Sequence, residues 1–130
     1  MTAEVRLGSI ERLDVEEAFV GVTRRRVDGA KCTLLFYAFA SGAAHGLHSH
    51  AEEQGMVVTS GSCQLHLGSS TRTATVGDYC VIPPDVEHGI TAGESGVELT
   101  VIIAPRRTTE YEVRPLPAAD ESCVAARNSL

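Results

Sequence analysis

The sequence predicts an all-β fold, either a sandwich or a barrel, and three observations support this prediction. Short runs rich in Val, Ile, Thr, Leu and aromatic residues recur through the middle of the chain. Glycine and proline separate these runs about every eight to twelve residues, a spacing typical of short strands joined by turns. No segment shows clear helical periodicity apart from DVEEAF, residues 14–19, for which we expect a single helical turn.

The runs expected to form strands can be read in chain order, and turn signals lie between them. They are KCTLLFYAFA (31–40), GMVVTS (55–60), CQLHLG (63–68), TRTATV (71–76), YCVIPP (79–84) and VELTVIIAP (97–105). We expect hairpin turns at TSGSC (59–63) and LGSSTR (67–72). The strand entered through Gly77 and Asp78 should end at Pro83 and Pro84, because proline has no N–H to donate to a neighbouring strand.

Composition limits the class of protein. The chain has 130 residues, of which 43% are hydrophobic and 22% charged, and its formal charge is −6. These values fit one globular domain, which we place at residues 1–115, with a tail at 116–130 that forms a short helix or is disordered. The only basic cluster, TRRRV at 23–27, is expected to be a solvated strand edge, which argues against nucleic-acid binding.

Location is predicted from what the sequence lacks. There is no signal-peptide pattern and no apolar segment long enough to span a bilayer, so we expect a cytoplasmic protein without membrane contact. The four scattered cysteines are expected to be reduced and mostly buried.

Chemistry concentrates in GAAHGLHSHAEEQGMVVTSG, residues 42–61. His48 and His50 are two residues apart, so on a strand their side chains leave the same face. Gln54 follows a bend and shares a face with Met56 and Val58. Neutral imidazole is a common metal ligand, and two buried imidazoles without partners would be costly. With His88, which lies beyond the two prolines, these side chains can converge inside a sandwich.

At this point the chain resembles the cupins, whose motifs are G-x5-H-x-H-x3-E-x6-G and G-x5-P-x-G-x2-H-x3-N. The first motif is matched, with Gln in place of Glu, at Gly42, His48, His50, Gln54 and Gly61. The second is matched in part, with Asp85 in place of Gly and Ala92 in place of Asn, at Gly77, Pro83 and His88.

The resemblance implies a double-stranded β-helix, or jelly roll, that holds one divalent metal ion per chain. The implied ligands are His48, His50, Gln54 and His88, and the sequence does not choose among Ni, Zn, Mn, Fe and Co. Glu52 and Glu53 are expected to lie in a solvated bend; the competing interpretation makes Glu53 the fourth ligand. The site could also be a relic that binds metal weakly or only stabilises the barrel.

A His-His-Gln-His set resembles that of two kinds of cupin. One comprises the pectin-degradation cupins that open unsaturated uronic acids, and the other comprises polyketide cyclases. HSHAEEQ, VIPPDVEHG and APRR look most like the first kind, but that kind carries an acidic residue where Val101 stands here. Val101 and Ile103 share a face, so with Met56 we expect them to line an apolar substrate pocket.

These features favour a metal-dependent, non-redox isomerase, cyclase or lyase acting on a small anionic or enolisable carbonyl substrate. No general acid or base stands out; the candidates are Tyr79, Tyr37 and Arg25. His45 is expected at the pocket rim or surface, and His66 is expected to face water. The alternatives are a dioxygenase that uses Fe(II) and O₂, or a ligand-binding sensor without turnover.

Because single-barrel cupins commonly pair, we expect a homodimer in which FVGVTRRRV (19–27) adds to a partner.

Overall fold

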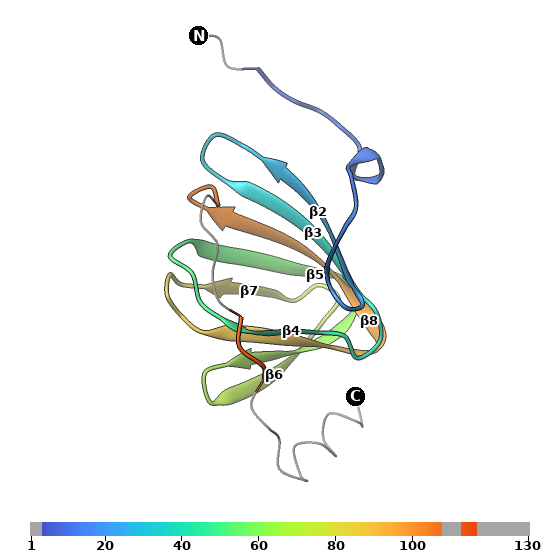
Figure 1. The fold of residues 1–130 in the computed structure, drawn as a ribbon, viewed down its shortest axis with the longest axis vertical. Helices are drawn as coiled ribbons and strands as arrows, with labels where there is room; N and C mark the ends of the chain where they lie inside the picture. Colours follow the sequence, from blue (N-terminus) through green and yellow to red (C-terminus); the bar gives the residue numbers. More distant parts are fainter. Residues whose placement is uncertain (1–3, 108–112, 117–130) are drawn as a thin grey trace.

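The computed structural model describes residues 4–107 and 113–116, and nearly all of the regular structure within them is β-strand (Figure 1). The strands are β1 (Glu16–Phe19), β2 (Val22–Asp28), β3 (Thr33–Phe39), β4 (Ala44–His48), β5 (Glu53–Leu67), β6 (Ser70–Thr75), β7 (Tyr79–Ile82) and β8 (His88–Ala104). The expected all-β jelly roll is confirmed.

Two long strands organise the fold. β5 has 15 residues and β8 has 17, and the two pair antiparallel along most of their length. Each changes its other partner on the way: β5 pairs first with β7 and then with β6, and β8 pairs first with β4 and then with β3. β2 and β1 continue the sheet beyond β3. The result is two layers that share β5 and β8 (Figure 1).

The core lies on the inner face of these strands, and period-two alternation selects its members. Along β3 every second side chain is buried, from Thr33 to Phe39. Along the C-terminal half of β8 the buried residues are Val97, Leu99, Val101 and Ile103. One contiguous cluster joins these residues with Leu35, Met56, Val58, Cys63, Leu65, Ile82, Ile90 and others.

Turn predictions were right where the chain reverses and wrong at residues 59–63. LGSSTR does join β5 to β6, and β7 does end at Ile82, directly before Pro83. TSGSC, by contrast, lies within the continuous β5, where the register with β8 shifts between Gly61 and Cys63. Gly61 has a φ of 73°, and a Cβ there would overlap the carbonyl oxygen of Gly96 on β8. The glycine therefore permits a bulge and a close strand approach, where the sequence had suggested a hairpin.

The helical turn expected at DVEEAF was also wrong. Residues 16–19 form β1, and the single 3-10 turn comes earlier, at Ile10–Arg12. β1 pairs with β2 in its own chain. The expected tail at 116–130 lies outside the described residues apart from Leu116. None of the described segments forms a helix with the length and hydropathy that a membrane crossing requires. The described cysteines, Cys32, Cys63 and Cys80, are free thiols.

Candidate metal centre

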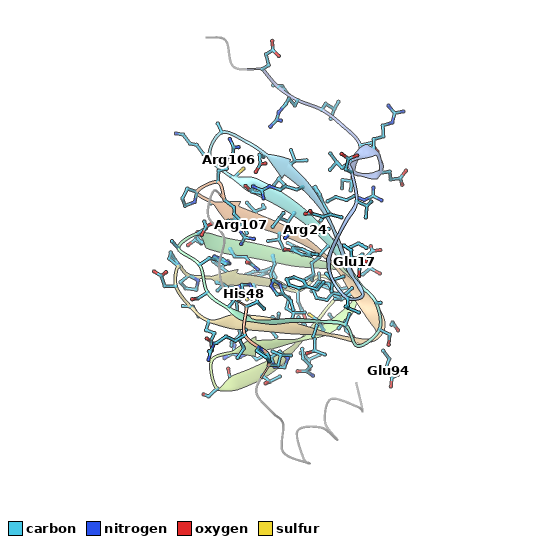
Figure 2. The ribbon with its side chains drawn as sticks, viewed as in Figure 1. Glu17, Arg24, His48, Glu94, Arg106 and Arg107 are labelled. Atoms are coloured by element: carbon cyan, nitrogen blue, oxygen red, sulfur yellow. The ribbon has the colours of Figure 1, made fainter. Side chains whose placement is uncertain are left out.

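Three histidines meet between the two layers. His48 is the last residue of β4, and His88, the first residue of β8, lies directly opposite it in the strand pair. His50 comes two residues after β4 ends. All three are buried, and their potential ligand atoms lie within 4.8 Å of one another. In the view of Figure 2, His48 lies over the middle of the fold, whereas Glu94 lies at its edge. The structure thus brings together the three histidines that the sequence singled out.

Main-chain carbonyl groups fix the orientation of each ring. The Nδ1 atoms of His48, His50 and His88 lie 2.8, 2.9 and 2.8 Å from the carbonyl oxygens of Gly46, Glu52 and Val86, respectively. A carbonyl oxygen can only accept, so each Nδ1 carries the proton and donates it. A neutral ring protonated at Nδ1 has its lone pair on Nε2. Each histidine therefore presents a metal-binding nitrogen.

Gln54 completes the arrangement from β5. Its side chain is buried, and its Oε1 lies 3.1 Å from Nε2 of His50. When Nδ1 of His50 donates to its carbonyl partner, these two facing atoms are both acceptors, and a cation between them would satisfy both. Two ligand atoms about 2.1 Å from one ion and at right angles to each other are about 3 Å apart, so the spacing suits a shared ion.

The donor set passes a test of fit to a divalent metal ion. Nε2 of His88 is fully buried and has no hydrogen-bond partner among the described residues. A buried nitrogen lone pair without a donor is unfavourable in a folded protein, and a metal ion would satisfy it. Imidazole nitrogens with an amide oxygen suit the first-row transition metals. The histidine triad could therefore hold a metal ion.

Burial also keeps these rings neutral. It lowers the pKa of His48 to about 2 and that of His88 to about 4. In both cases desolvation is the largest cause; repulsion between two protonated rings adds to it, with His45 as the neighbour of His48 and His50 as the neighbour of His88. Unprotonated imidazole is the form that binds metal, so at neutral pH the site needs no deprotonation of these two rings.

A fourth imidazole lies behind the triad, and its predicted position was wrong. His45 was expected at the rim or surface, yet it is buried and stacks on His48 with ring centroids 3.9 Å apart and planes 11° apart. Phe19 lies on it with a centroid distance of 4.3 Å. Burial, together with the charge of His88, lowers the pKa of His45 to about 3. A register shift between His45 and His48 lets residues three apart face the same interior, which simple alternation cannot predict.

The prediction that Glu52 and Glu53 lie in a solvated bend was right for only one of them. Glu53 is exposed, as expected of a solvated residue, and this orientation contradicts its alternative role as fourth ligand. Glu52 is only 4% exposed. Its carboxylate oxygens lie 3.8 Å from Nδ1 of His50 and 3.8 Å from Nε of Arg107. Arg107 is buried too, and the sequence analysis gave it no role.

The three candidate acid–base residues lie in three different parts of the structure, and only one of them is on the inner face. Tyr79 is 80% exposed, opposite the exposed Val57, so it lies on the outer face. Arg25 donates from Nη1 to the carbonyl oxygen of Ile10 at the exposed N-terminal segment. Tyr37 is buried on the inner face, where its hydroxyl accepts a 3.5 Å hydrogen bond from Arg24.

The residues expected to form an apolar wall lie beside Gln54. In the pairing of β5 with β8, Gln54 is opposite Ile103 and Met56 is opposite Val101. All three apolar side chains are at most 3% exposed. His66 was expected to face water, but it is half-buried, with Nε2 2.9 Å from the hydroxyl of Thr91.

Comparisons with known proteins agree with this fold. A family model for the Cupin domain matches residues 35–103. An RmlC-like cupin from Shewanella frigidimarina is 23% identical with a TM-score of 0.74, over 82% of this chain and 96% of that one. KdgF from Halomonas sp. is 24% identical with a TM-score of 0.70, over 75% and 92% of the two chains. A variant of oxalate decarboxylase from B. subtilis is 17% identical with a TM-score of 0.75, over 87% of this chain but 34% of that one. At these identities the likeness concerns the fold alone. No curated protein matches the chain.

The low pKa values of His45, His48 and His88 predict that the metal-free protein loses stability in mild acid. Between about pH 6.5 and pH 4 the unfolded chain binds protons that the folded chain does not, so the free energy of unfolding falls as pH falls. Each such histidine contributes up to about 1.4 kcal/mol per pH unit. Urea denaturation at about pH 7 and about pH 5.5 measures the loss. Equal unfolding free energies at both pH values would contradict the prediction.

Proposed function

The chain belongs to the cupin family, and we propose that it is a metal-dependent, non-redox enzyme, an isomerase, cyclase or lyase, that acts on a small carbonyl or enolisable substrate. One observation carries this proposal: the ligand atoms of three buried imidazoles lie within 4.8 Å of one another, and the Gln54 amide oxygen lies 3.1 Å from Nε2 of His50. We assign His48, His50, His88 and Gln54 as ligands of one divalent ion per chain. An ion held there supplies Lewis-acid polarisation of a carbonyl or enolate oxygen.

The neutrality of the ligand set favours this chemistry over redox chemistry. Three neutral imidazoles and a neutral amide cancel none of the charge of the ion, so the site attracts an anionic oxygen ligand. The set also lacks the carboxylate of the two-histidine, one-carboxylate oxygenase pattern. Four protein ligands leave one or two positions open for substrate on a five- or six-coordinate ion.

The surroundings of the ligands favour a small anionic substrate. The wall of Met56, Val101 and Ile103 excludes water, which strengthens every electrostatic interaction with a bound oxyanion. The guanidinium groups of Arg107 and Arg24 are paired with the carboxylates of Glu52 and Glu16, so the attraction for an anionic oxygen would come from the bound ion itself. Of the three acid–base candidates we assign the proton-holding role to Tyr37, because it is buried on the inner face and Arg24 donates to its hydroxyl.

The metal assignment predicts near one equivalent of a transition metal per chain. Protein purified without chelators or added metal should contain it, and His48→Ala should lose most of it, because the variant removes one of the converging nitrogens. Elemental analysis makes the measurement and names the ion, with His66→Gln as the matched control that keeps its metal. A wild-type chain that neither contains nor takes up metal would make the site a relic and sink the enzyme proposal.

The charge argument predicts that Gln54→Glu slows the reaction while the metal stays bound. A carboxylate at position 54 partly neutralises the ligand set, so we expect at least tenfold slower exchange of α-protons for deuterium in small 2-oxo acids, followed by NMR. Gln64→Glu is the matched control, since Gln64 lies on the same strand and bonds to Thr73, away from the ligands. Equal rates for Gln54→Glu and wild type would contradict the prediction.

Oxygen uptake by the iron-loaded protein would instead favour the dioxygenase, and binding of a 2-oxo acid without any exchange would favour the sensor.

We also propose a homodimer that forms through the outer face of β5, β7 and β8. Four large apolar residues are exposed there, Val57 at 44%, Tyr79 at 80%, Val81 at 58% and Ile102 at 48%. Their strands are hydrogen-bonded neighbours, so the four side chains make one apolar surface. Tyr79→Glu should shift the sedimenting species from dimer to monomer, whereas Val20→Glu, at the exposed β1–β2 turn, should not. A wild-type monomer at micromolar concentration would refute the proposal.

A further inference from the structure

A buried carboxylate lies directly behind the metal centre. Glu52 is two residues after His50 and is 4% exposed, whereas its neighbour Glu53 is exposed. Neither carboxylate oxygen of Glu52 has a hydrogen-bond donor among the described residues. Burying a carboxylate is costly unless another charge compensates for it. The position of Glu52 in the interior therefore needs an electrostatic explanation.

Two groups face this carboxylate from opposite sides. Oε2 lies 3.8 Å from Nδ1 of His50, and Oε1 lies 3.8 Å from Nε of Arg107. The main chain of Arg107 is fixed, because its amide N–H donates to the hydroxyl of Thr33 and its carbonyl oxygen accepts from Arg26. The carboxylate therefore lies between the buried guanidinium of Arg107 and the ring of a proposed metal ligand.

The Nδ1–H of His50 faces two oxygen-bearing groups of the same residue. The main-chain oxygen of Glu52 accepts at 2.9 Å, and the side-chain carboxylate lies 3.8 Å away. A carboxylate close to the N–H of a ligating imidazole fixes its tautomer and raises its basicity as a ligand. It also places a negative charge beside a ligand set that, with Gln54, has none.

We propose that the Glu52 carboxylate, paired with Arg107, lies behind His50 and supplies, from outside the ligand set, the negative charge that stabilises the bound divalent ion. This inference rests on the metal site proposed above. It explains why Glu52 is buried while Glu53 is not. It also separates two tasks, since Gln54 contacts the ion without neutralising it and Glu52 compensates its charge through His50.

Cobalt(II) titration of the full chain tests the inference. Metal-free wild type, Glu52→Gln and Glu53→Gln are each titrated in competition with a chromophoric chelator, and the visible absorption of the bound Co(II) is recorded. We expect Glu52→Gln to bind Co(II) about 10-fold more weakly, the lower end of the range for changed outer partners of metal-ligating histidines, because the main-chain partner of His50 stays in place. Glu53→Gln makes the same change in charge one residue later, on the exposed side, and should stay within about twofold of wild type.

Other outcomes separate the inference from the metal site itself. If wild type binds Co(II) and Glu52→Gln binds it equally well, Glu52 is only part of a structural ion pair and the inference is overturned. If wild type binds no Co(II), the metal site fails, and the inference with it. Should Glu52→Gln not fold, the double variant Glu52→Gln, Arg107→Gln removes both charges and leaves no unpaired buried ion. The same weakening is expected, because the carboxylate lies between the guanidinium and His50.

Discussion

A buried imidazole has two ring nitrogens, and each requires a hydrogen-bond or metal partner because water cannot reach it. The arrangement of the site follows from which partner each nitrogen finds. For His48, His50 and His88 the Nδ1 partner is a main-chain carbonyl only two residues away in sequence. Local backbone geometry thus fixes each ring before any ligand arrives. Because Nδ1 donates to a main-chain oxygen in all three rings, Nε2 is the nitrogen left for a ligand, and the triad is preorganised for a metal ion that it could hold.

β8 then ties the site to the rest of the fold. Its first residue, His88, lies opposite His48, and near its other end Ile103 lies opposite Gln54 on β5. One strand therefore carries a member of the histidine triad at one end and the apolar wall near the other. The close approach of Gly61 to Gly96 lets β5 follow β8 through the change of layer. A rigid, non-local framework of this kind holds the ligand atoms in place against the desolvation cost of burying them.

How far the sequence predicts this structure depends on how regular the backbone is. Motif spacing identified His48, His50, Gln54 and His88, and alternation along β5 correctly buried Gln54 with Met56 and Val58. Prediction failed where the backbone leaves the period of two. The register shift in β4 buries His45, the bulge at Gly61 replaces a hairpin, and the bend before β5 turns Glu52 inward. Arg107 gave no local signal, because its burial depends on Thr33 and Glu52, which are remote in sequence.

The positions of Gln54 and Glu52 explain why a glutamine follows two glutamates in this motif. A carboxylate at position 54 would compensate the charge of the ion directly and so reduce its pull on a substrate oxygen. The carboxylate of Glu52 lies behind the ring of His50, further from the proposed ion than a ligand at position 54. It would stabilise the ion less strongly, because Coulomb attraction falls with distance. It also leaves the open coordination positions unoccupied. If the proposed roles of Gln54 and Glu52 hold, affinity for the ion and attraction for a substrate oxygen would be set by different residues, so each could change without abolishing the other.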